Sequence, residues 1–90
     1  MPLFEVTVVG RGLWIEIDHE VQRVAFRVAR VVDASDQTTA ADQALSLILA
    51  DPKARHAPGK PPPDLSIEQI DAAKAVPRVN PGFRFSPEEG

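Results

Sequence analysis

The histidines and their acidic neighbours are the residues whose chemistry would be easiest to recognise. Asp18, His19 and Glu20 are consecutive, and His56 is the other histidine of the chain. Such groups could bind a metal ion or transfer a proton, but neighbouring side chains of an extended segment point to opposite faces. A zinc site commonly needs three or four convergent ligands, and this chain has two histidines and no cysteine. We therefore interpret residues 18–20 as a solvated turn and predict no catalytic residue and no metal site.

Arginines form the second candidate group, with members at Arg11, Arg23, Arg27 and Arg30. Arg23 and Arg27 share parity on a strand, so both point to one face of a sheet. If Arg11 joined them from a nearby turn, the cluster could bind phosphate or an acidic peptide. The alternative is a solvated sheet face on which the arginines pair with acids across the strands: Glu5, Glu16 and Asp18.

Arg30 breaks an otherwise apolar pattern. It shares parity with Val24, Phe26 and Val28, so strict alternation would place its charge among core residues. We expect Arg30 at the sheet periphery, with its stem on apolar surface and its head in water. A bulge near residues 29–31 would also remove the conflict.

Aromatic residues form the third candidate group. Trp14 alternates with Leu13 and Ile15, which places it on the face opposite theirs, and tryptophan is enriched at interaction hot spots. Phe83 and Phe85 point to one side of an extended segment near the C-terminus. Two alternatives stay open: this segment covers Trp14 within the chain, or Trp14 and the phenylalanines contact a second subunit.

Composition limits the possible function classes. The 90 residues, 43% of them hydrophobic, predict one small domain that buries only about 60–65% of its unfolded surface, which favours pairing as a homodimer. The absence of cysteine removes thiolate chemistry, and no phosphate-binding glycine loop or nucleophile motif is present, so we predict no enzyme and no cofactor. A net charge of −3 argues against a generic nucleic-acid binder.

The expected cellular location of the protein depends on whether the sequence contains a signal peptide or a long apolar run. No leading segment resembles a signal peptide, and the longest apolar runs are far shorter than the roughly 20 residues that a membrane span needs. We expect a cytoplasmic protein without membrane contact.

Strand periodicity dominates the first third of the chain. Residues 3–9 and 13–17 alternate between apolar and polar side chains, and Gly10-Arg11-Gly12 between them predicts a hairpin turn. The alternative is a single long strand bent at the two glycines. After the polar break at residues 18–20, a further strand from Val21 or Arg23 to Asp33 would return antiparallel.

Helical periodicity follows. Ser35 or Asp36 supplies the N-cap, the helix should end near Asp51-Pro52, and its apolar stripe is Ala41, Ala44, Leu45 and Ile48. A proline-rich loop over residues 52–64 then leads to a strand from Leu65 to Ile70, or alternatively to a short helix from Ser66 to Ala75.

These elements predict a two-layer α+β fold in the order β-β-β-α-β. An antiparallel sheet of three to four strands carries one principal helix on one face. Residues 1–76 form the single domain, and residues 77–90 form an extended C-terminal tail.

The run AFRVARVVDA from Ala25 to Ala34, the capped alanine-rich helix after it, and GFRFSPEE from Gly82 to Glu89 together resemble a family of small bacterial proteins of unknown function. The resemblance spans most of the chain and implies no particular activity. Residues 31–49 show a weaker likeness to HicB-type antitoxins. The glycine-cysteine turn and the appended DNA-binding segment of those antitoxins are missing, so DNA regulation is not implied.

We therefore expect a non-enzymatic module that associates with itself or with another protein, through a sheet edge or through the face that bears Trp14. The alternative is a nucleic-acid or anionic-ligand binder that uses the four arginines. Salt separates the two, because phosphate binding weakens steeply with ionic strength whereas an apolar interface does not.

Overall fold

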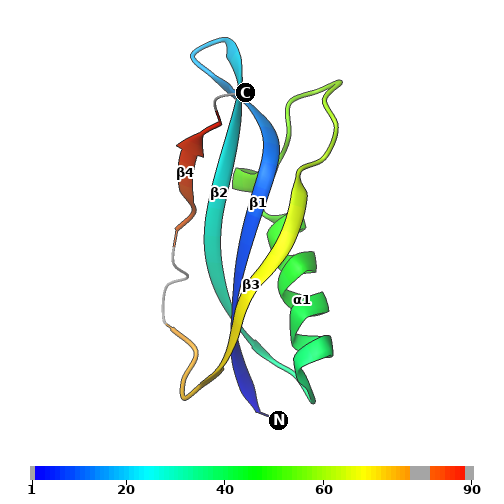
Figure 1. Cartoon of the computed structure of the whole chain (residues 1–90), viewed down its shortest axis with the longest axis vertical. Helices are drawn as coiled ribbons and strands as arrows, with labels where there is room; N and C mark the ends of the chain where they lie inside the picture. The colour runs from blue at the N-terminus through cyan, green and yellow to red at the C-terminus, as the bar shows by residue number, and fades with distance from the viewer. Residues whose placement is uncertain (1, 78–81, 89–90) are drawn as a thin grey trace.

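A computed structural model describes residues 2–77 and 82–88 of the chain. The elements are β1 (Leu3–Ile17), β2 (Glu20–Asp33), α1 (Gln37–Ala50), the 3-10 turn η1 (Pro52–Ala54), β3 (Asp64–Ala73) and β4 (Arg84–Pro87). These strands form one antiparallel sheet in the order β3-β1-β2-β4, and α1 packs against one of its faces (Figure 1). The predicted α+β class with one principal helix is confirmed.

β1 is a single long strand with a bulge in its middle. Gly10 lies opposite Phe26 and Leu13 opposite Val24, so Arg11 and Gly12 together face one residue of β2. Gly12 adopts a φ of +68°, a conformation that glycine accepts without a steric penalty. The bulge shifts the alternation by one residue, which places Leu13 on the same face as the residues before it. The predicted hairpin at residues 10–12 is therefore wrong, and the element order is β-β-α-β-β.

The hairpin between β1 and β2 lies at Asp18-His19, within the polar break where the sequence predicts that the chain turns back. Both residues have positive φ angles, 50° and 69°, as the two central residues of a type I′ turn require. Asp and His tolerate this region better than most non-glycine residues. Both side chains are exposed, as expected for a solvated turn.

α1 begins and ends where the sequence predicts. Asp36 is the N-cap, and its Oδ1 accepts the Thr39 N–H at 2.8 Å. This hydrogen bond lowers the pKa of the Asp36 carboxyl, because it favours the charged form. The helix ends at Ala50, and Pro52 follows the C-cap. The buried stripe is Ala40, Ala44 and Ile48, while the predicted Ala41 and Leu45 are only half-buried.

β3 is a strand, as predicted, so the alternative helix over residues 66–75 is wrong. It is an edge strand that pairs with β1, and because β1 is antiparallel to both β2 and β3, these two run parallel. A parallel pair needs a long crossover, which α1 and the loop after it provide. Within that loop the Ala57 N–H donates to the Trp14 carbonyl at 2.6 Å.

The core lies between the sheet and α1. Its largest fully buried side chains are Phe26, Leu13, Ile48, Val6 and Val8. The Phe26 ring occupies the space where a Cβ on Gly10 would stand. A glycine at this point of β1 therefore leaves room for a large aromatic ring of the neighbouring strand.

The C-terminal segment completes the sheet. Of the predicted tail, residues 78–81 and 89–90 lie outside the described residues, while Arg84–Pro87 pair with Val24–Arg27 as β4. Glu88 accepts the N–H of Gly12 at 2.9 Å, which satisfies a donor that the bulge leaves unpaired, and it forms an ion pair with Arg23 at 3.2 Å.

Candidate binding surface on the uncovered sheet face

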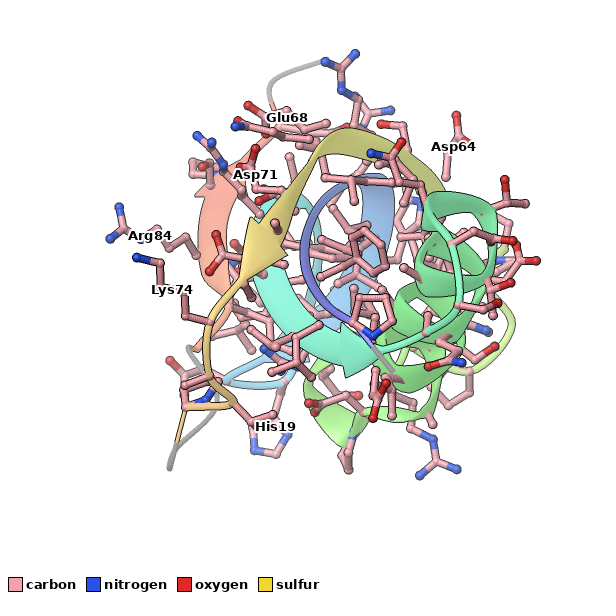
Figure 2. The ribbon with its side chains drawn as sticks, turned by 90° about the horizontal axis from the view of Figure 1, so that it is seen from below. His19, Asp64, Glu68, Asp71, Lys74 and Arg84 are labelled. Carbon is pink, nitrogen blue, oxygen red and sulfur yellow. The ribbon has the colours of Figure 1, made fainter. Side chains whose placement is uncertain are left out.

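The uncovered face is the side of the sheet opposite α1. Small side chains form its centre, since Thr7 of β1 lies directly opposite Ala29 of β2 and both are half-buried. Figure 2 shows Asp71, Lys74 and Arg84 on the side of the molecule away from α1. An antiparallel sheet can expose one face to water, so this face needs a specific feature before it counts as a site.

Two hollows that meet at Ala29 provide such a feature. We call the first the arginine hollow; it is lined by Thr7, Arg27, Val28, Ala29, Gly82 and Arg84. The second, the valine hollow, is lined by Glu5, Ala29, Val31, Ala72, Ala73, Lys74, Ala75, Val76 and Pro77. Gly82, just before β4, borders the arginine hollow, and residues 74–77, just after β3, border the valine hollow.

A third cavity continues the valine hollow towards α1. It shares Val31 and Val76 with the valine hollow and is also lined by Arg30, Leu47, Ala50, Asp51 and Pro52. The apolar surface is therefore continuous from the uncovered face, past β2, to the C-terminal end of α1.

The structure does not gather the four predicted arginines. Arg23 and Arg27 lie on the uncovered face, and the exposed Arg11 lies at the bulge, opposite Asp64 of β3. Arg30 lies on the covered face. The register between β1 and β2 is unbroken at Arg30, so no bulge turns it outward.

The predicted peripheral position of Arg30 is wrong, because the residue is only 7% exposed. Its Nη1 donates to the Ala29 carbonyl at 2.8 Å, and its Nη2 donates to Asp51 Oδ2 at 3.4 Å. Its guanidinium also lies 5.4 Å from the centre of the Phe83 ring. The C-cap residue of α1, Asp51, thus supplies the acid that a buried arginine needs. The sequence predicts that the helix ends there, but it does not show that this end lies beside Arg30.

The two arginines predicted on the uncovered face are paired with acids. Arg23 pairs with Glu88 at 3.2 Å, and Arg27 pairs with Glu68 at 3.1 Å. These acids reduce the positive potential that a polyanion would need. The interpretation as an acid-paired solvated face therefore has support, although the partners are not the three acids that the sequence suggested.

Arg84 is the site residue that sequence reasoning missed. It lies directly opposite Arg27 in the β2–β4 register, and both line the arginine hollow. Its alternation with Phe83 and Phe85 was visible in the sequence and indicates that it points away from the side that the phenylalanines cover. Its neighbour across the strands could not be inferred, because the pairing partner of β4 was unknown.

The aromatic candidates separate onto opposite faces. Trp14 is half-buried on the uncovered face, with Lys60 Nζ 4.4 Å and the Arg23 guanidinium 5.9 Å from its ring centre. Phe83 and Phe85 instead pack on Phe26, with ring centroids 5.2 and 6.2 Å from it. Of the two alternatives for Trp14, cover by the phenylalanines is therefore wrong, and two cations from the same chain lie over the indole. Contact of Trp14 with a second subunit stays a prediction.

The described residues were compared with the requirements of a metal-binding cluster and of a membrane-spanning helix. In that part of the chain, no group of three or more His, Asp or Glu side chains is placed to hold a metal ion. Neither is any described helix long and apolar enough to cross a bilayer.

Comparisons with known proteins add no assignment. The chain matches no protein-family model, no curated protein and no solved structure. The resemblance to a family of small bacterial proteins therefore stays a prediction.

Proposed function

We propose that this chain is a non-enzymatic self-association module and that two copies dock through one apolar patch. The apolar patch consists of residues around the valine hollow and the end of α1: Val31, Leu47, Ala50, Pro52, Ala72, Ala75, Val76 and Pro77. The observation that carries the proposal is that this exposed apolar surface continues from the sheet onto the helix.

Two large residues of the patch are exposed by more than half. Val76 is 59% and Leu47 52% exposed, although both are large apolar residues. Contiguous exposed apolar surface on a small domain commonly marks an interaction site, whereas a single exposed leucine does not. Burying such side chains in an interface would stabilise a chain whose own core is small.

A second copy is the partner that the surrounding charges favour. The rim of the valine hollow carries one acid, Glu5, and one base, Lys74. In a two-fold dimer the same patch meets itself, so Lys74 of one copy can approach Glu5 of the other. The charged pair behind the patch, Arg30 and Asp51, is already neutralised within the chain.

The test is the solution mass by light scattering at low and high salt. We expect the parent to be a dimer at both ionic strengths, because an apolar interface is not screened. Val76→Asp should yield a monomer with an unchanged circular dichroism spectrum. Val21→Asp is the matched control, since Val21 is 43% exposed near the hairpin turn and remote from the patch.

A parent that is monomeric in both buffers contradicts the proposal. So does a parent that dimerises only at low salt, because that result would point to charge pairing on the uncovered face. Equal loss of the dimer in both valine variants would show that the apolar patch is not the interface.

A further inference from the structure

We propose that the arginine hollow is a binding site for a small oxyanion, a carboxylate or phosphate group, held jointly by Arg27 and Arg84. This site lies beside the apolar patch but shares no residue with it. It goes beyond self-association and does not depend on it.

The register brings the two guanidinium groups together. The Glu88 N–H donates to the Arg23 carbonyl at 3.1 Å, which makes residues 23 and 88 a hydrogen-bonded pair. Such pairs recur at every second position, so Arg27 and Arg84 also form one, with Cα atoms about 5.5 Å apart. Their side chains therefore leave the sheet side by side.

This arrangement places like charges directly opposite each other, which destabilises a sheet. Glu68 offsets part of that charge through its ion pair with Arg27. This ion pair remains open to water, because the Arg27 side chain is 58% and the Glu68 side chain 40% exposed. Within the described residues Arg84 has no ion pair. Of the two arginines, Glu68 thus pairs with Arg27 alone, and an anion bridging Arg27 and Arg84 would reduce the repulsion between them.

The lining of the hollow fits an oxyanion. A guanidinium presents parallel N–H donors that match the oxygens of carboxylate and phosphate groups. Thr7 adds a hydroxyl, while Ala29 and Gly82 leave room between the arginines. The ligand should be small, because Glu68 and Asp71 on β3 would repel an extended polyanion such as a nucleic acid.

Glu68 acts in this site as an internal competitor. Its carboxylate occupies Arg27 at 3.1 Å in the free chain, so an incoming anion must displace or share it. Removing the charge of Glu68 should therefore strengthen anion binding. A purely structural role for the Arg27–Glu68 pair predicts no such gain.

The experiment titrates the full chain with inorganic phosphate, and separately with acetate, at constant ionic strength made up with chloride. The NMR signals of the arginine Nε–H groups report each site. We expect saturable shifts at Arg27 and Arg84. Glu68→Gln should lower the dissociation constant roughly two- to fivefold, the range that an exposed ion pair contributes.

Two further variants complete the test. Arg84→Gln should weaken binding by roughly tenfold or more, because it removes a charge-assisted donor pair. Arg11→Gln is the matched control, an exposed arginine outside the hollow, and should leave binding unchanged. Saturation by both probes supports a general oxyanion site, and saturation by phosphate alone supports a phosphate site.

Non-saturating shifts of equal size in the Arg11→Gln and Arg84→Gln variants would overturn the inference. So would unchanged or weaker binding in Glu68→Gln. Because this readout follows arginine signals and the self-association test follows mass, either proposal can fail without the other.

Discussion

The two faces of this sheet come from the same strands, but the same residue types differ on them in burial and in their partners. Arg30 on the covered face is buried, hydrogen-bonded and paired with Asp51, whereas Arg27, three positions earlier, is exposed and pairs with Glu68 at the surface. The aromatic residues divide in the same way. Phe26 is 2% exposed beneath other rings, and Trp14 is half-buried under two cations.

The difference shows which charges are available for binding. A charge on the covered face must find its partner within the fold, because burial without one is costly. A charge on the uncovered face remains hydrated, so its pairing is weak and exchangeable. Function is therefore expected on the uncovered face and around its rim, and stability on the covered face.

The largest expected contrast is between the two large aromatic residues. Phe26→Ala should cost about 3 to 5 kcal/mol, because it leaves a cavity between Gly10 and the C-terminal rings. Trp14→Ala should cost about 1 to 2 kcal/mol, since the indole is only partly removed from water. Urea unfolding measures both. If Phe26→Ala does not fold, Phe26→Leu should still lose more stability than Trp14→Ala, and the opposite order would break the comparison.

The two arginines give a sharper contrast with smaller effects. Arg30→Met should cost about 2 to 3 kcal/mol, because it leaves the partly buried Asp51 carboxylate without this partner. Arg27→Met should cost less than about 1 kcal/mol, because its ion pair is exposed. Both replacements keep a long apolar stem. Chemical denaturation measures the free energy of unfolding of both variants. Equal losses would mean that the buried ion pair of Arg30 contributes no more to stability than the exposed ion pair of Arg27.

The smallest change in stability is expected from the N-cap of α1, the helix that covers one face of the sheet. The pKa of Asp36 lies below its ordinary value of 3.8, because the charged carboxylate accepts the Thr39 N–H. Its stabilising contribution is therefore present above pH 3.8 and is lost as pH falls through the lowered pKa. Asp36→Ala should lower the thermal midpoint slightly at neutral pH.

Thermal scans of the parent and Asp36→Ala between pH 7 and pH 2 check the sign. The gap between their midpoints should stay constant down to about pH 5 and close under more acidic conditions. A gap that widens on acidification would contradict the role of the charged cap. Asp42→Ala is a suitable control, because Asp42 is exposed further along the helix and does not cap it.

Local patterns predicted much of the fold because local physics decides them. The N-cap at Asp36, the helix end before Pro52 and the strand beginning near Leu65 each depend on a few neighbouring residues. The segment Gly10-Arg11-Gly12 was ambiguous for the same reason. Glycine accepts a turn or a bulge equally well, and only pairing with β2 selects the bulge.

The candidate sites were harder to predict, because they depend on residues distant in sequence. Strand parity correctly placed Arg23, Arg27 and Trp14 on the uncovered face. It gave no indication that Arg84 lies opposite Arg27, or that the end of α1 and the segment after β3 form one apolar patch. These juxtapositions arise from the position of β4 and from the path of the crossover.

The sequence by itself determined the α+β class, the single helix with its boundaries and the face to which most strand residues point, because alternation and capping act over a few residues. Only the tertiary structure decided that residues 3–17 form one bulged strand, that Arg30 is buried against Asp51 and that Arg84 joins Arg27. Each of these outcomes depends on contact between two segments that are distant in sequence. Such a contact contributes to stability only after the chain has closed the loop between the two segments.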